Sequence, residues 1–277
     1  MPTFPCPNPI TLEVRIPGGE IHLAAEPRNT AEVEVTPYDD SAASREAAEQ
    51  TIVEFHGDRL AIYSPEPVGR VLRWRVPQVR VTAHVPAGSD ASLNVAAADT
   101  TCRGDWGSVV LHAASGDTVL DRLTGDLTVH CATGGVKVEQ VGGRVTAKAA
   151  AGDLAAGRIG GPIEIKTASG GVSVERADAD VAIKTASGDI RVGAVRQGRV
   201  HTNTVSGDVS VGVVAGTAVW LDLNSLAGET RSDLAMGGDV EAHGATAHSL
   251  TIQARAVSGS INVHRVTPAE STTTQRD

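Results

Sequence analysis

Charged side chains recur at a fixed spacing along the chain, and two sets of them could do chemistry. Histidine and lysine residues are separated by one constant interval at His112, His130, Lys148, Lys166 and Lys184. Aspartate residues recur in glycine-containing turn sequences at Asp117, Asp153, Asp189 and Asp208. Aligned ammonium groups could bind an anionic partner, and aligned carboxylates could bind Ca²⁺. Both functions require that equivalent positions face the same way, which depends on the underlying repeat.

The central part of the sequence repeats with the same constant period. The first glycines of successive small-residue turns are Gly116, Gly134, Gly152, Gly170 and Gly188, and the next, Gly207, comes one position late. A second set of turns, at Gly125, Gly142–Gly143 and Gly160–Gly161, divides each repeat into halves. We therefore predict that each half of a repeat forms one strand followed by one turn.

Apolar residues alternate within each half, as expected of strands. One set of equivalent positions comprises Val136, Leu154, Val172, Ile190 and Val209, and a second comprises Leu127, Val145, Ile163, Val181 and Val200. The apolar positions recur with gaps of 2, 3, 4, 2, 3, 4. We therefore predict an all-β fold, a parallel β-solenoid in the form of a flattened two-sheet β-helix with about 18 residues per coil. Aromatic residues make up only 3% of the chain, which fits a narrow core.

The regions on either side of the repeats differ in pattern. Residues 1–90 predict a β-rich N-terminal cap, with strands near 10–16, 31–35, 51–55 and 78–85 and turns at 17–19 and 56–58. A short helix is expected from Ser41 to Gln50, with Asp39 and Asp40 as capping candidates. Residues 91–265 are expected to form the solenoid. After a loop at 236–248, a final strand pair at 249–254 and 260–263 is expected to close the stack. Residues 266–277 predict a disordered tail.

The repeat sequence also carries a family resemblance. Segments such as Thr185-Ala186-Ser187-Gly188-Asp189-Ile190-Arg191-Val192 and Thr204-Val205-Ser206-Gly207-Asp208-Val209 resemble the bacterial putative-adhesin, toastrack-type β-strand-repeat family. The resemblance extends from about residue 10 to 265. It implies a stacked-strand fold, and it supplies no catalytic residues because the family's function is undefined. Some members are linked by context to cell-envelope stress responses.

The turn aspartates have two interpretations. Stacked carboxylates bind calcium in nonapeptide β-roll proteins, whose turns read GGxGxD, but that motif does not occur here. Gly135 and Gly171 stand between the first three aspartates and reduce charge repulsion. We favour the interpretation that aspartate and glycine simply form turns.

The lysine set also has two interpretations. His130, Lys148, Lys166 and Lys184 predict a stripe that binds an anion or a partner, and the alternative is solvated surface charge. Glu164, two positions from Lys166, would offset part of the repulsion. His112 and His130 could together contact a metal, but two ligands do not make a site. Thr167, Thr185 and Thr204 form the set beside the lysines, and Cys131 belongs to it; we expect Cys131 to be exposed and Cys102 to lie in the core.

Charge and cysteine content narrow the function classes. A net charge of −9 argues against nucleic acid as a general partner. The beginning of the sequence shows no basic and apolar leader pattern, and the three cysteines, an odd number without metal-ligand spacing, suit a reducing compartment. We therefore expect a cytoplasmic protein without a cofactor or a metal.

The sequence predicts a non-enzymatic scaffold or interaction module rather than an enzyme. Its partner would be another protein, or a second copy of this chain, that contacts the faces or the ends of the solenoid. The module could therefore self-assemble, or it could act in the cell-envelope stress response. One alternative is a carbohydrate-active β-helix enzyme, although its candidate carboxylates are interleaved with arginines: Asp121, Glu139 and Glu175 with Arg122, Arg158 and Arg176. Another alternative is an envelope-stress sensor that binds anions or lipid through the lysines. Membrane contact is therefore retained as an alternative.

Overall fold

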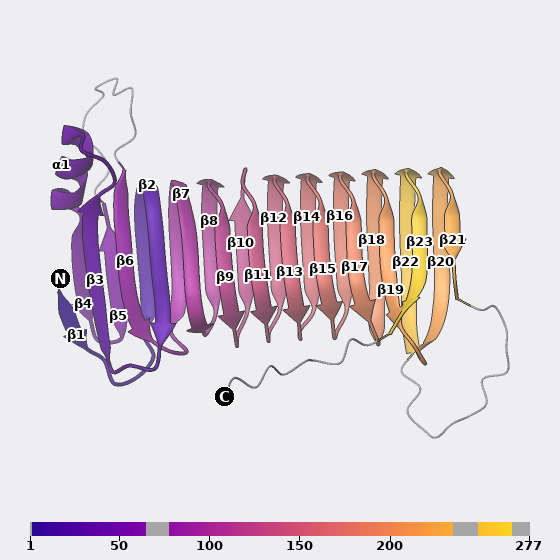
Figure 1. Cartoon of the computed structure of the whole chain (residues 1–277), viewed down its shortest axis with the longest axis horizontal. Helices are drawn as coiled ribbons and strands as arrows, with labels where there is room; N and C mark the ends of the chain where they lie inside the picture. The colour runs from indigo at the N-terminus through magenta and orange to yellow at the C-terminus, as the bar shows by residue number, and fades with distance from the viewer. Residues whose placement is uncertain (1, 65–77, 235–248, 268–277) are drawn as a thin grey trace, which may run out of the picture.

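The computed structural model describes residues 2–64, 78–234 and 249–267, and Figure 1 shows an elongated stack of strands with a helix at the N-terminal end. The predicted loop at 236–248 and most of the predicted tail at 266–277 lie outside the described residues. The middle of the stack is an all-β, parallel solenoid, as the sequence repeat predicts.

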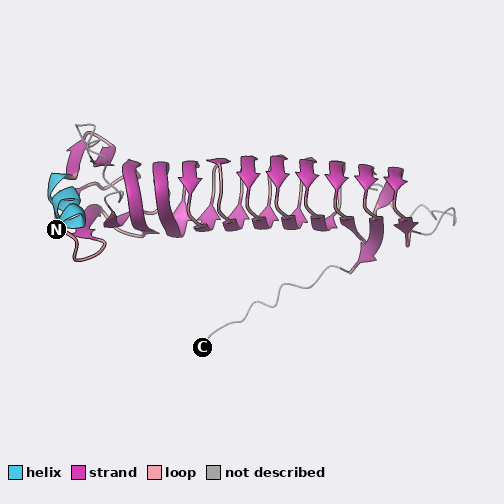
Figure 2. Cartoon of the chain, turned by 90° about the horizontal axis from the view of Figure 1, so that it is seen from above, coloured by secondary structure: helices cyan, strands magenta, loops and turns pink. Residues whose placement is uncertain are grey.

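Two sheets face each other along the stack, and Figure 2 shows them as two layers joined by loops. We call the first sheet the lysine face. It contains β8 (Val109–Ser115), β10 (Leu127–Cys131), β12 (Val145–Ala151), β14 (Ile163–Ser169), β16 (Val181–Ser187) and β18 (Gly198–Ser206). We call the second the mixed face. It contains β9 (Thr118–Leu123), β11 (Val136–Val141), β13 (Leu154–Ile159), β15 (Val172–Ala177), β17 (Ile190–Val195) and β19 (Val209–Val214).

Equivalent residues of successive coils lie beside one another, and we call each such set a row. Val136, Leu154, Val172 and Ile190 pair in one row of the mixed face, and all are buried. Leu127, Val145, Ile163 and Val181 form the matching row of the lysine face. The predicted register is therefore confirmed, and the aliphatic core lies between the two faces.

Glycine is required at the corner where each coil passes from the lysine face to the mixed face. Gly152 has a φ of 128°, in the left-handed region that side chains avoid. A Cβ atom there would lie 2.0 Å from the carbonyl oxygen of Gly134 in the preceding coil. The recurring turn glycines therefore allow neighbouring coils to approach to the spacing of paired strands.

The inward positions of the lysine face differ from the predicted gaps. Thr167, Thr185, Thr204 and Cys131 are buried, so this set forms a third inward row of the lysine face. Strict alternation along β10 explains the difference, because Leu127, Val129 and Cys131 point inward and His130 points outward. The next position, Ala150 in the following coil, is exposed. The predicted gap of 3 between successive inward positions is therefore found on the mixed face only.

The parallel stacking extends into the N-terminal region. β2 (Thr11–Glu26) lies parallel to β7 (Asp90–Trp106) over the length of both faces. The predicted turn at 17–19 is wrong, because β2 continues through these residues and bends there from one face to the other. Gly19, with a φ of 124°, occupies the bend. The boundary proposed at residue 90 stays a prediction.

The outer part of the N-terminal region is antiparallel. β1 (Thr3–Pro5) and β6 (Val79–Pro86) pair with β3 (Thr30–Pro37), while β4 (Ile52–His56) and β5 (Arg59–Tyr63) form a hairpin. The predicted helix is present as α1 (Ala42–Gln50). Its cap is Ser41, whose hydroxyl accepts from the Ser44 amide, rather than Asp39 or Asp40. Within the described residues, no helix is long and apolar enough to cross a membrane.

The C-terminal coils are stacked out of sequence order. β22 (Ser249–Ser258) lies between β18 and β20 (Ala218–Ala227), and β23 (Ile261–Val266) lies between β19 and β21 (Thr230–Ser232). The prediction that the final strand pair closes the stack is therefore wrong. The inward side chains of β22 and β23 are almost fully buried, whereas those of β20 stay partly exposed. The more apolar coil thus occupies the position with neighbours on both sides.

Candidate functional site

The predicted stripe residues form one outward row on the lysine face. His112, His130, Lys148, Lys166 and Lys184 are paired in register across five neighbouring strands. The row continues through Asn203 and Arg255 in one direction and through Asn94 and Arg15 in the other. We call these residues the lysine row. None of them is acidic, so every ionisable group in the row is cationic when it is charged.

Within the described residues, one carboxylate is ion-paired with a lysine of this row, and Glu13 is paired with Arg15 at its N-terminal end. Glu164 Oε1 lies 2.7 Å from Lys166 Nζ, and both side chains are about half exposed. The hydrogen bond from Lys166, followed by the charge of that ammonium, holds the pKa of Glu164 below its ordinary value. Lys148 and Lys184 have no ion pair within the described residues. Their charges are therefore available to a ligand.

Apart from Glu164, the residues that flank the lysines and histidines on either side carry short side chains. On one side lie Thr128, Thr146, Glu164 and Ala182. On the other side lie the exposed residues Ala132, Ala150, Ala168 and Ala186. Because the flanking side chains are short, the lysine ammonium groups extend beyond them. This arrangement exposes a line of positive charge on a flat sheet.

The two histidines of the row stack on each other. Their ring centroids are 5.1 Å apart and their planes differ by 6°. Partial burial, the charge of His112 and the charge of Lys148 together lower the pKa of His130. The described residues contain no group of three or more His, Cys, Asp or Glu side chains that could hold a metal. The stacked pair therefore gains no third ligand from its surroundings.

The turn aspartates bind the backbone of the next coil. Oδ1 of Asp117 accepts a hydrogen bond from the amide of Gly135 at 2.7 Å, and Oδ1 of Asp153 accepts one from Gly171 at 2.8 Å. Asp189 and Asp208 repeat the pattern with the amides of Asp208 and Ser260. These contacts give the carboxylates a structural role and support the turn-forming interpretation over the calcium one.

The carboxylates of the alternative enzyme hypothesis are spread over the mixed face. Glu139 and Glu175 belong to β11 and β15, which are separated by β13. Asp121 accepts a hydrogen bond from the amide of Gly104 at 3.0 Å. Neighbouring arginines form ion pairs with other carboxylates, Arg122 with Asp105 at 2.6 Å and Arg176 with Asp178 at 3.0 Å. The arrangement is a surface of interleaved charges.

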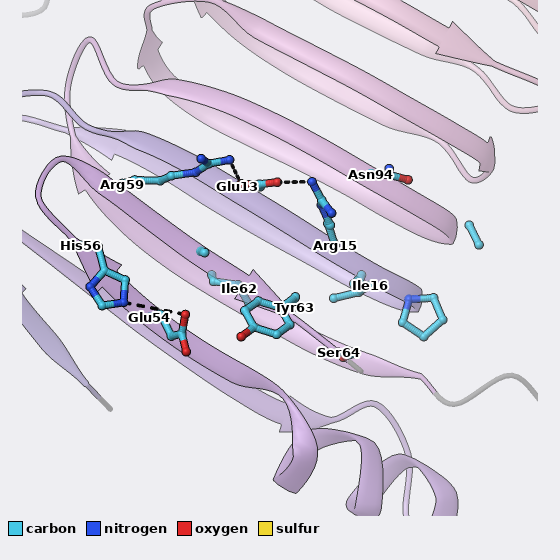
Figure 3. A pocket seen from close by; sticks show the side chains of 13 residues that line it. Glu13, Arg15, Ile16, Glu54, His56, Arg59, Ile62, Tyr63, Ser64 and Asn94 are labelled. Atoms are coloured by element: carbon cyan, nitrogen blue, oxygen red, sulfur yellow. Dashed lines mark hydrogen bonds and ion pairs between the residues drawn. The ribbon is translucent and has the colours of Figure 1, made fainter. Parts of the chain in front are cut away.

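The structure reveals a groove that the sequence patterns did not indicate. It lies between the β4–β5 hairpin and the outer surfaces of β2 and β7, and its charged residues include Glu13, Arg15, Glu54, His56 and Arg59 (Figure 3). β5 pairs with β2, and the pairing brings together segments that are far apart in the sequence. No local spacing could have indicated that contact.

All three cysteines are free thiols and buried. Cys102 lies in the core as predicted. Cys131 is also buried, so the expectation that it is exposed is wrong, because it occupies an inward position of β10. Burial raises the thiol pKa of both cysteines. Neither has the exposed, low-pKa character of a reactive cysteine.

The fold and its surface rows define a parallel β-solenoid with one cationic face. Residues 161–277 match the protein family described as Toastrack DUF4097. The resemblance to the toastrack-type family is thereby confirmed for this C-terminal part of the chain. The match begins within the stack, before β14.

Several solved structures are similar over most of this chain. A putative adhesin from Parabacteroides distasonis is 12% identical and has a TM-score of 0.47, and one from Bacteroides fragilis is 12% identical with a TM-score of 0.41. A putative lipid binding protein from Parabacteroides distasonis is 11% identical with a TM-score of 0.36. In each comparison the alignment covers 96% of this chain and 95% of the other. No curated protein matches the sequence.

Proposed function

We propose that this chain is a non-enzymatic interaction module whose lysine face binds an acidic segment of a protein partner. The observation that carries the proposal is the alignment of Lys148, Lys166 and Lys184 in a single outward row with one facing carboxylate, Glu164. The fold itself contributes a rigid, flat support because every strand of this face is paired on both sides in its middle coils.

Electrostatics gives the row a reason to bind an anion. Neighbouring coils are about 4.8 Å apart. Two unit charges at that distance repel by about 1 kcal/mol in water-like surroundings. An extended acidic segment that runs along the row would relieve this repulsion and gain attraction at each coil. We expect the interaction to weaken as salt concentration rises, because the row is exposed.

A charge-matched pair of variants tests the proposal. The first is Lys148→Gln, Lys166→Gln and Lys184→Gln, on the lysine face. The control is Lys137→Gln, Arg158→Gln and Arg191→Gln, which removes the same number of positive charges from the mixed face. Binding of fluorescent poly-L-glutamate is followed by anisotropy at low and high salt. We expect about tenfold weaker binding in the lysine-face variant only.

Three outcomes would contradict the proposal. The first is the absence of binding to poly-L-glutamate by the unaltered protein at low salt. The second is an equal loss of binding in both variants, which would mean that only total charge matters. The third is binding to vesicles that contain phosphatidylserine but not to poly-L-glutamate, which would favour a lipid-binding sensor.

A separate observation favours self-association through the C-terminal end. Within the described residues, β20 pairs only with β22 along its length, so its other edge lacks a strand partner. Trp220 and Leu226 on β20 are 56% and 81% exposed. At the other end, the antiparallel strands and α1 differ in geometry from a parallel coil. We therefore propose end-to-end pairing of two C-terminal coils, which closes as a dimer.

Light scattering during size-exclusion chromatography tests this second candidate. We expect a dimer that the double variant Trp220→Ser and Leu226→Ser converts to a monomer. The control is Val119→Ser, which removes an exposed apolar side chain in the middle of the mixed face. A monomer at every concentration, or a dimer that survives the double variant, would contradict end-to-end pairing.

We also propose that the protein lacks catalytic activity and resides in the cytoplasm. The spread of Asp121, Glu139 and Glu175 over the mixed face supports the first point, and three unpaired thiols support the second. Turnover of a polysaccharide that Glu139→Gln or Glu175→Gln abolishes would overturn the first. Recovery of the native protein from a compartment outside the cytoplasm would overturn the second.

A further inference from the structure

The groove beside the β4–β5 hairpin has the size and polarity of a small-molecule site. Its volume is about 850 Å³, within the usual range of ligand pockets. The charged and polar side chains that line it come from four strands, β2, β4, β5 and β7, and from Ser64, which directly follows β5. Ile16, Pro17, Ala61 and Ala96 add apolar surface. The groove thus combines an apolar lining with a few charged groups.

Two arginines in the groove share one carboxylate. Arg15 Nη2 lies 2.6 Å from Glu13 Oε1, and Arg59 Nη2 donates a hydrogen bond to Glu13 Oε2. The Glu13 side chain is 14% exposed, whereas those of Arg15 and Arg59 are 64% and 60% exposed. Figure 3 shows Glu13 between the two guanidinium groups. Glu13 therefore fixes both arginines from below and leaves them accessible from the groove.

The charges of this cluster do not cancel. Burial of Glu13 would raise its pKa, but the hydrogen bond from Arg59 and the charges of both arginines outweigh burial and hold that pKa below its ordinary value. Glu13 is thus ionised at neutral pH and neutralises one of two guanidinium charges. Each guanidinium also has five N–H donors, most of which Glu13 cannot occupy. The cluster keeps one net positive charge and a surplus of donors.

The hairpin side of the groove is polar and aromatic. Glu54 Oε2 lies 3.9 Å from His56 Nε2. Tyr63 lies on the adjacent strand, and partial burial together with the charge of Glu54 raises its pKa. The Tyr63 hydroxyl is hydrogen-bonded to Glu54, so Tyr63 stays neutral and offers its ring face to a ligand.

We propose that this groove binds a small organic acid, about as large as a monosaccharide, whose carboxylate or phosphate group contacts Arg15 and Arg59. Guanidinium groups suit both anions because their paired N–H donors match two oxygens. A metal ion does not fit, because Glu13 is already paired with two arginines, and Glu54 and His56 alone supply only two ligands. A purely apolar ligand would leave the charged groups without partners.

The proposal is independent of the interaction proposed for the lysine face, although the two sites are adjacent. Arg15 pairs in register with Asn94, and Asn94 pairs with His112. The groove therefore lies at the N-terminal end of the lysine row. The lysine-to-glutamine variants leave all groove residues unchanged, so failure of one proposal is distinguishable from failure of the other.

Isothermal titration calorimetry with three probes tests the groove. The probes are D-glucuronate, D-glucose 6-phosphate and D-glucose, which share a sugar ring and differ in the acid group. We expect at least one acid to bind with a Kd of about 1 mM or lower. We expect D-glucose to bind at least about tenfold more weakly than that acid. Binding of one acid but not the other would identify the anion.

Matched variants locate the binding. Arg15→Gln with Arg59→Gln should weaken acid binding about tenfold or more. The control, Arg80→Gln, breaks a similar surface ion pair with Glu20 at 2.8 Å, outside the groove, and should leave binding unchanged. If the double variant does not fold, Ala96→Trp should instead block the groove without altering the ion pairs. Absence of binding by both acids, or binding that survives the double variant and Ala96→Trp, would overturn the proposal.

Discussion

The lysine face and the mixed face share one backbone design and differ in what they present to solvent. On the lysine face, cationic residues occupy the same position in one coil after another. On the mixed face, the corresponding outward row reads Lys137, Ala155, Ser173 and Arg191. A row with Glu139 and Glu175 lies beside it. The inward residues and the turns therefore keep the coil register, and the outward rows are free to differ.

The corner that joins the two faces should be the position most sensitive to substitution. Gly152→Ala would place a Cβ atom 2.0 Å from the carbonyl oxygen of Gly134, and its backbone has a positive φ. We expect a loss of about 3 kcal/mol or more of unfolding free energy, measured by urea unfolding.

Gly57→Ala provides the control, because this hairpin glycine also has a positive φ but no atom lies within 4 Å of the added Cβ. We expect it to cost about 1 kcal/mol, from backbone strain alone. Equal costs for the two substitutions would show that contact between the coils does not make the corner sensitive.

The inward rows of the two faces should contribute equally to stability. Ile183 on β16 and Ile190 on β17 belong to opposite faces of the same coil, and both are buried. We expect Ile183→Ala and Ile190→Ala each to cost about 3 kcal/mol in urea unfolding. If the losses of unfolding free energy in the two variants differ by more than about 2 kcal/mol, the two faces do not share one core.

The smallest effect should come from the ion pair on the lysine face. The pKa of Glu164 is lowered in the folded protein, so its contribution to stability is present above the unfolded-state value of 4.5 and is lost as pH falls through the folded-state pKa. Glu164→Gln should remove this dependence. Thermal unfolding of both proteins between neutral pH and pH 3 would show it as a slightly smaller acid destabilisation in the variant. An unchanged pH profile would contradict the pairing with Lys166.

The sequence predicted the regular coils well, because each depends on a constant repeat and a strict alternation of apolar residues. The inward position of Cys131 could have been found from that same alternation. The order of the last coils could not, because no local pattern indicates that β22 lies between β18 and β20. The groove was missed for a similar reason, because Arg59 reaches Glu13 only when the hairpin folds onto β2.

Moving the charge row from one face to the other would test most directly whether alignment of charge creates the binding surface. In the variant that carries Lys148→Gln, Lys166→Gln and Lys184→Gln, Ala155→Lys and Ser173→Lys would complete a cationic row between Lys137 and Arg191 on the mixed face. We expect poly-L-glutamate binding to return from about tenfold weaker to within about twofold of that of the unaltered protein. Binding that stays about tenfold weaker despite the completed row would contradict the account.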